Sequence, residues 1–218
     1  MFDLPVEGVE LLAIEFGDIV NYFSIYTAML FTFALLFTLL AIISLPEKPL
    51  DIVFGGDAYY AKEIPKDQVR FQRFMAIACG LATLGAMVSG DIFNFTLFSS
   101  MIGITNIGIV AAVQNRHVLE AAYQYGIVAM VATIPLFGGA AIVLASTGTL
   151  SIWALAGAAA VPLIAKIFLV LGVMGEGMAP FYIAKAEITR APGAPYVLMI
   201  HVSSLLLFLR IVEIVLTI

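Results

Sequence analysis

Charged residues are scarce in this chain: Asp, Glu, Lys and Arg make up 11% of its 218 residues, while 62% are hydrophobic. A soluble domain carries about a quarter charged residues, so the composition indicates an integral membrane protein. There is one cysteine, Cys79, which excludes an internal disulfide and a cysteine-ligated cluster within the chain. The few basic residues form no stripe of the kind that binds nucleic acid.

Motifs for cofactors and catalysis are also missing. The sequence contains no nucleotide-binding loop, no Gly-rich phosphate-binding motif, no cluster of metal-ligand residues and no nucleophile motif. Its two histidines, His117 and His201, lie far apart. The beginning of the chain has no basic region, so no cleavable signal is expected. We therefore expect no cofactor and no redox or hydrolytic centre within this chain.

Long apolar runs predict an all-α bundle of about six transmembrane spans in a single domain, residues 1–218. At 1.5 Å per residue, a helix of about 20 residues crosses the roughly 30 Å of hydrocarbon in a bilayer. An acidic segment, 1–19, comes first, and a polar loop, 46–73, follows the first span. Gly90-Asp91 makes a very tight turn. The expected spans are 20–45, 74–89, 92–113, 121–145, 152–178 and 196–217.

The distribution of basic residues predicts the orientation. With alternating spans, eight of the ten lysines and arginines fall on the side of loop 46–73. Lys166 and Arg210 lie within spans. An excess of basic residues marks the cytoplasmic side, so this loop is predicted to be cytoplasmic and both termini to lie outside the cell membrane. The eight residues are Lys48, Lys62, Lys66, Arg70, Arg73, Arg116, Lys185 and Arg190.

Three ionisable residues within the last two spans are candidates for an ion pathway, because a charge in the bilayer costs at least a few kcal/mol and often marks such a route. Lys166, near the middle of the fifth expected span, either passes a proton or pairs with a carboxylate and fixes helix register. Glu176 lies ten residues, about 15 Å, further along a helix. It is either a water-linked relay member or solvated at the interface. His201 titrates near neutrality but could equally tie two helices together.

Four other polar residues lie in or at the ends of spans. Asp91 and Glu120 are expected to cap the third and fourth spans, where the helix dipole favours an acid. Arg210 and Glu213 are three residues apart on one helical face and are expected to form an ion pair.

Three segments resemble the antiporter-like subunits shared by respiratory complex I, Mrp antiporters and membrane-bound nickel–iron hydrogenases. RFQRFMAIACGLATLGAMVSGDIFNFTLF is similar to the fourth and fifth helices of that family, and LEAAYQYGIVAMVATIPLFGGAAIVLASTGTLSI to the next helix and loop. EGMAPFYIAKAEITRAPGAPYVLMIH is similar to the broken seventh helix, here near Glu176–Pro180, and to the start of the eighth. The likeness covers residues 70–210 in the same order. It implies a fold like the first (N-terminal) half of an antiporter-like subunit.

The departures from this family concern its ionisable residues. The glutamate of the fifth family helix falls on Ser99-Ser100, and the lysine before the proline of the seventh falls on Gly175. A polar group early in the sixth family helix is represented by Gln124, and the histidine of the eighth is kept as His201. The resemblance therefore implies that two residues of a glutamate–lysine switch are missing, while Gln124 joins Asp91, Arg210 and Glu213 as secondary candidates.

The resemblance implies a role in coupling hydrogen and ferredoxin chemistry to movement of H+ or Na+. The NiFe and iron–sulfur centres would lie on partner subunits, and the partners would be other membrane and hydrogenase subunits and the lipid bilayer. Two alternatives remain open: an ion-conducting half-channel with Lys166, Glu176 and His201 as relay members, and a non-conducting scaffold that lost the switch. A free-standing secondary transporter is disfavoured, because such proteins close with a second repeat.

Overall fold

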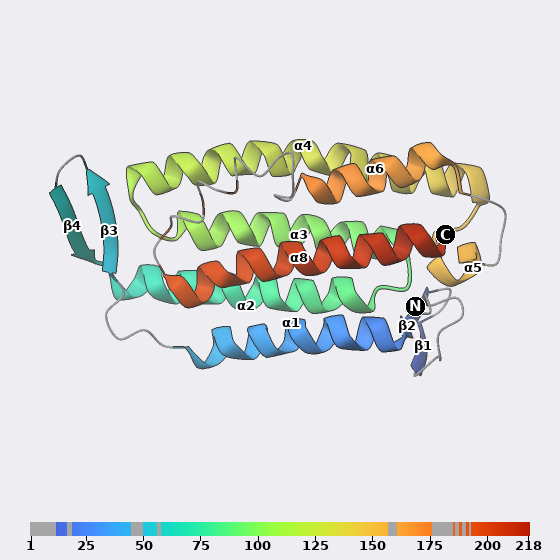
Figure 1. The fold of residues 1–218 in the computed structure, drawn as a ribbon, viewed down its shortest axis with the longest axis horizontal. Coiled ribbons are helices and arrows are strands. Elements are labelled where there is room, and N and C mark those ends of the chain that lie inside the picture. The colour runs from blue at the N-terminus through green and yellow to red at the C-terminus, as the bar shows by residue number, and fades with distance from the viewer. Residues whose placement is uncertain are drawn as a thin grey trace.

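The computed structural model describes residues 12–16, 19–44, 50–55, 58–156, 161–175, 185, 188, 191 and 193–218. Long helices lie side by side and nearly parallel in a bundle (Figure 1). The elements in chain order are β1 (Leu12–Phe16), β2 (Ile19–Phe23), α1 (Ile25–Ile43), β3 (Leu50–Gly55), β4 (Ala58–Glu63), α2 (Lys66–Val88), α3 (Ile92–Ala111), α4 (Arg116–Thr147), α5 (Ile152–Ala156), α6 (Leu163–Met174) and α8 (Ala194–Thr217).

Within the described residues, five helices are long and apolar enough to cross a membrane: α1, α2, α3, α4 and the Pro195–Thr217 part of α8. Large apolar side chains cover the outside of the bundle, among them Phe33 at 57% exposure and Ile134 at 71%. Such surface suits hydrocarbon, and a helix satisfies its own backbone hydrogen bonds there. The chain is therefore a helical multi-pass membrane protein, as the sequence predicts.

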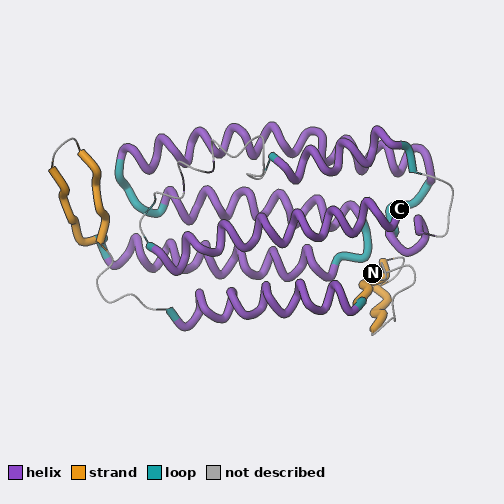
Figure 2. The backbone as a smooth tube through the Cα atoms, in the orientation of Figure 1, coloured by secondary structure: helices purple, strands orange, loops and turns teal. Residues whose placement is uncertain are grey.

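Two short antiparallel hairpins flank the helices rather than joining the bundle (Figure 2). β1 pairs with β2 before α1, and β3 pairs with β4 between α1 and α2. The expected first span, 20–45, is shorter at its start, because Ser24 caps α1. Its hydroxyl accepts from the Thr27 N–H (3.1 Å), and the Thr27 hydroxyl accepts from the Ser24 N–H (2.6 Å). This reciprocal arrangement is a capping box.

The fifth expected span, 152–178, is not one helix. It contains α5, of five residues, and α6, of twelve. Twelve residues extend about 18 Å, well short of the hydrocarbon thickness. Pro162 immediately precedes α6, and a proline cannot be accommodated without loss inside a continuing helix. The predicted break near Glu176–Pro180 lies outside the described residues.

The turn between α2 and α3 is as tight as predicted. Asp91 caps α3, with its carboxylate accepting from the Asn94 N–H at 2.8 Å, so this capping role is confirmed. The prediction for Glu120 is wrong. α4 begins earlier, at Arg116, and Asn115 is its N-cap; Glu120 instead pairs with Arg116 at 2.9 Å on the exposed surface.

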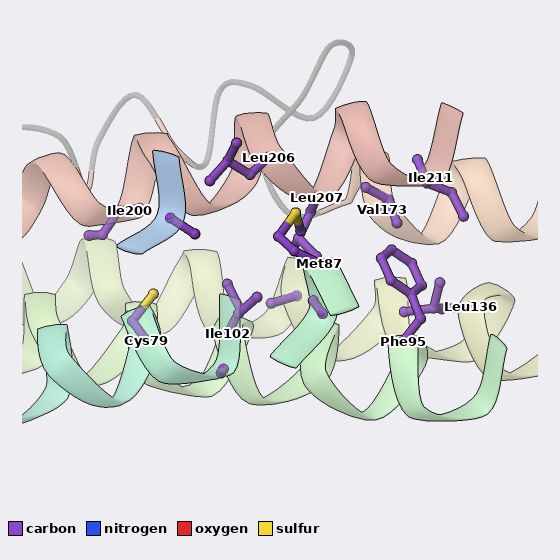
Figure 3. Packing of buried hydrophobic residues seen from close by; sticks show 14 of the residues in the cluster. Cys79, Met87, Phe95, Ile102, Leu136, Val173, Ile200, Leu206, Leu207 and Ile211 are labelled. Atoms are coloured by element: carbon purple, nitrogen blue, oxygen red, sulfur yellow. The ribbon is translucent and has the colours of Figure 1, made fainter. Parts of the chain in front are cut away.

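α8 runs through the middle of the bundle and α1 along its edge. Within the chain, 61% of the apolar stretch of α8 is buried, against 28% for α1. Figure 3 shows buried side chains from several helices packed together in the core. Those of α8 are Ile200, Leu206, Leu207 and Ile211, and those of the other helices are Cys79, Met87, Phe95, Ile102, Leu136 and Val173. The residues near the end of α8 are therefore surrounded by protein.

Glycine lets α4 and α6 approach closely. A Cβ added at Gly172 of α6 would lie 2.8 Å from the Cα of Leu136 and 2.9 Å from its nitrogen. Both atoms belong to the backbone of α4, so no side-chain rotation would relieve the clash. Small residues at such crossings are what close helix packing in lipid requires.

Candidate functional site

Lys166 lies in the first turn of α6, at the end of the bundle where α8 terminates (Figure 1). The expectation that it lies near the middle of a span is wrong. Its half-buried ammonium group donates to the main-chain oxygens of Val215 (3.4 Å) and Ile218. The last carbonyls of a helix have no partner within the helix, and a cation beside them is favourable. Lys166 therefore caps the C-terminus of α8.

Arg210 is buried on α8 and bonds in two directions. One amino group forms an ion pair with Glu213, as the sequence predicts. The other donates to the Ser89 carbonyl oxygen at 2.8 Å, and Ser89 is the C-cap residue of α2. Arg210 thus holds the end of α2 against α8.

Arg73 makes the same kind of contact at the opposite end of the bundle. Its guanidinium donates to the carbonyl oxygen of Ile42, in the last turn of α1. The Tyr196 hydroxyl from α8 donates to the carbonyl oxygen of the adjoining Ser44 at 2.8 Å. In the described part of the chain, Arg73, Lys166 and Arg210 each bind a carbonyl at the C-terminal end of another helix. Their contacts are those of helix caps.

The Arg210–Glu213 pair is not completely satisfied. Both residues are 2% exposed, yet Glu213 Oε1 and Arg210 Nε have no hydrogen-bond partner among the described residues. The hydroxyl of Ser24, which caps α1, and Tyr26 of α1 lie within interaction range of the Glu213 carboxylate. A buried polar atom without a partner is costly, which makes this pair a candidate site for exchange with water.

A second set of polar side chains forms hydrogen bonds between three helices in the core. The Cys79 thiol of α2 donates to Asn106 Oδ1 of α3 at 3.3 Å, and Asn106 Nδ2 donates to the Tyr125 hydroxyl of α4 at 3.3 Å. All three residues are completely buried. Sequence reasoning missed Asn106, although an amide inside an apolar run is itself a signal.

His201 and Lys185 lie near one another. His201 is half-buried in the first half of α8, and Lys185 is close enough for their charges to interact. Lys185 is 3% exposed, and its place on the cytoplasmic side stays a prediction. Gln72 lies in the predicted loop 46–73 but is buried in α2, where its amide donates to the Ile109 carbonyl at 3.1 Å.

The remaining sequence candidates do not join these groups. Gln124 is exposed on α4, and the Asp91 carboxylate is engaged by the main chain and side chain of Asn94. Glu176 lies outside the described residues. Asp91, Lys166, Arg210 and Glu213 belong to one end of the bundle, and His201 and Lys185 lie away from it. Within the described ranges, no three His, Cys, Asp or Glu side chains gather as metal ligands.

Comparison with known proteins places the whole chain in one family. Residues 1–218 match the family model described as NADH dehydrogenase I, subunit N related protein. The chain belongs to this family. The uncharacterised protein MJ0522 of Methanocaldococcus jannaschii is 49% identical over 206 residues, which are 94% of each chain. A second protein of that organism, MJ1309, is 33% identical over 115 residues, 50% of this chain and 24% of MJ1309.

The fold is also found in a solved structure. A chain of respiratory complex I from Thermus thermophilus with bound aureothin matches with a TM-score of 0.50 and 17% identity. The match covers 89% of this chain and 53% of the complex I chain. This chain therefore has the fold of part of that complex I chain and spans about half of its length.

Proposed function

We propose that this chain is a membrane subunit of a complex I-related, energy-converting hydrogenase. In that assembly, hydrogen and ferredoxin chemistry on partner subunits drives movement of H+ or Na+. The observation that carries the proposal is the family match over the full length, supported by a fold like half of a complex I chain. The finer proposal is a chain like one of the small membrane subunits in the A-type energy-converting hydrogenase of methanogens.

The shape of the bundle supports a role within a larger assembly. Among the described residues, α6, a helix of twelve residues, packs against α4, a helix of 32 residues. Exposed apolar residues continue along α4, including Met130 at 69% and Tyr123 at 72%. Neighbouring membrane subunits would cover part of this apolar surface, and lipid would cover the rest. NiFe and iron–sulfur centres belong to those partners in the proposal.

Ion movement through this chain would use its buried ionisable groups. In one region of the bundle, the ion would pass by His201, with Lys185 nearby. At the end near Lys166, it would pass by the Arg210–Glu213 pair. Glu176 and His201 stay relay candidates in the proposal, whereas Lys166 contributes by fixing the end of α8. The side with exposed Lys66, Arg70 and Arg116 would face the cytoplasm, and both termini would lie outside.

A non-conducting scaffold is the second candidate. The contact of Lys166 with Val215 and Ile218 favours it, because a lysine used as a helix cap needs no role in transport. Ser100 and Gly175, which stand where the antiporter-like subunits have charged residues, also favour it. Under this alternative the assembly remains the same, and ions move through a partner subunit.

Purification in mild detergent through a tag on this chain tests membership of the assembly. The proposal predicts that nickel- and iron–sulfur-containing subunits co-purify in fixed proportion and that the preparation reduces ferredoxin with H2. Recovery of this chain alone, from membranes in which hydrogenase activity elutes elsewhere, would contradict it. Ion flux by such an isolated chain in liposomes would instead support a free-standing transporter.

A further inference from the structure

The Arg210–Glu213 pair is buried near the end of α8. Each residue is 2% exposed, and they lie three positions apart on the same helix. A charged pair in such surroundings is retained at a cost in desolvation that its mutual attraction alone need not repay. The groups around the Arg210–Glu213 pair indicate which additional interaction the pair makes.

The hydrogen bonds of the pair leave one carboxylate oxygen open. Glu213 Oε2 accepts from Arg210 Nη1, and Arg210 Nη2 donates to the Ser89 carbonyl at 2.8 Å. Glu213 Oε1 and Arg210 Nε have no partner among the described residues. One acceptor and one donor are therefore available to a water molecule in a region from which lipid is excluded by protein.

The charged and titratable groups nearest this site come from α1, from the α2–α3 connection and from α6. Tyr26 of α1 and the hydroxyl of its cap, Ser24, lie on one side. The α2–α3 connection contributes the Ser89 carbonyl and, further on, Asp91, whose oxygens are occupied by Asn94. α6 contributes Lys166, which binds α8 two residues beyond Glu213, at Val215. Arg210 is the one cation bonded directly to the Glu213 carboxylate in the described part of the chain.

We propose that Glu213 is a proton-binding site, loaded through water from the end of the bundle where α8 terminates. This inference rests on the proposed ion-coupling function and identifies H+ as the ion at this site. A proton leaves a hydronium ion and forms an O–H bond at Glu213 Oε1, which turns the carboxylate into a neutral acid and the hydronium into water. Oε2 continues to accept from Arg210, and release reverses the same step.

The contact between Arg210 and Ser89 makes the protonated state tolerable. When Glu213 is neutral, the guanidinium still lies at the negative end of the α2 helix dipole and still bonds the Ser89 carbonyl. Its charge is therefore compensated in both states. A neutral Glu213 does not leave a bare buried cation behind.

The same guanidinium argues against a sodium ion. Hard metal cations in proteins take several oxygen ligands, whereas Glu213 offers one open oxygen among the described residues. A sodium ion held there would also be repelled by Arg210 at short range in a medium of low dielectric constant. A proton needs a single oxygen and removes a charge.

Infrared difference spectroscopy on the tag-purified complex tests the inference. Lowering the pH should produce a band of a protonated carboxylic acid that shifts in D2O and is absent from the Glu213→Gln complex. Glu120→Gln is the matched control, since Glu120 is exposed at the other end of the bundle, and should leave the band unchanged. Glu213→Asp keeps a carboxyl group and should give a displaced band. This variant provides the test if the Glu213→Gln complex does not assemble.

The outcomes separate this inference from the proposed function. A band that survives unchanged in Glu213→Gln and Glu213→Asp, or no carboxyl band over the pH range in which the complex is intact, overturns it. A titration displaced by added Na+ in a saturable way also overturns it, in favour of a metal cation site. The co-purification result is independent of these spectra, so either proposal can fail while the other stands.

Discussion

The ammonium group of Lys166 donates to the main-chain oxygen of Val215 at 3.4 Å and so binds the last turn of α8. This contact predicts that Lys166→Met destabilises the chain by about 1 kcal/mol, the usual scale for a cation at a helix C-terminus. Lys166→Arg should recover much of the loss. Thermal unfolding of the purified complex measures the effect. The number of ions moved per electron should stay the same; if it collapsed while stability was unchanged, Lys166 would belong to the ion pathway.

The ion pair in the bundle should respond more strongly to a single replacement than to a double one. Arg210→Met leaves Glu213 buried without its partner, which typically costs about 3–5 kcal/mol, whereas replacing both members by apolar residues often costs little. We therefore expect Arg210→Met to reduce the amount of folded chain in membranes severely. Arg210→Met combined with Glu213→Leu should restore it. Equal loss in the single and double variants would show that the ion pair is not the relevant interaction.

The close crossing of α4 and α6 makes two glycines respond differently to the same change. Gly172→Ala places a Cβ against the backbone of Leu136 and should cost about 1–3 kcal/mol, as overpacking does. Gly138→Ala, also at this crossing, meets Phe168 at an ordinary 3.5 Å and should be tolerated. Denaturant titration of both variants in detergent makes the comparison. A tolerated Gly172→Ala would contradict the described packing.

The amide of Asn106 should be energetically coupled to the hydroxyl of Tyr125. Interhelical hydrogen bonds in membrane proteins contribute about 0.6 kcal/mol on average. A double-mutant cycle of Asn106→Leu with Tyr125→Phe is expected to give a coupling energy of this size. The unfolding free energies of the four variants provide it. A coupling energy of zero would mean that the 3.3 Å contact contributes nothing to stability.

The predicted orientation can be read from the two ends of α4. Cys79 is the only cysteine and is buried, so a Cys79→Ala chain is a clean background for labelling. Arg116→Cys and Ser146→Cys introduce exposed thiols at opposite ends. A membrane-impermeant maleimide should label Arg116→Cys in inverted vesicles and Ser146→Cys in right-side-out vesicles. The opposite pattern would reverse the orientation.

Local patterns in the sequence predicted the features that depend on neighbours in the chain. The spacing of Arg210 and Glu213 indicated their pairing, and Gly90-Asp91 indicated both the tight turn and the cap of α3. Features that depend on distant contacts were missed. Nothing near Lys185 in sequence signals its burial or its closeness to His201 of α8.

The error in the fifth span has a different origin. Residues 152–174 contain one charged residue, Lys166, and their hydropathy conceals the break before α6. Pro162 is the residue that indicates this break, because its ring disfavours a continuous helix. Without a break at Pro162, Lys166 would fall at mid-span; with it, Lys166 lies in the first turn of α6. Its carbonyl partners on α8 lie about 50 residues away in sequence, so only the fold identifies them.

In the proposed function, this chain couples hydrogen and ferredoxin chemistry to ion movement. The most direct test measures H2-dependent ferredoxin reduction in closed membrane vesicles from cells that lack the chain and from cells in which it is restored. Vesicles with the chain should show reduction that uncouplers abolish, and vesicles without it should lose that reduction while still oxidising H2 with an artificial acceptor. Uncoupler-sensitive reduction at the full rate in the absence of the chain would contradict the account.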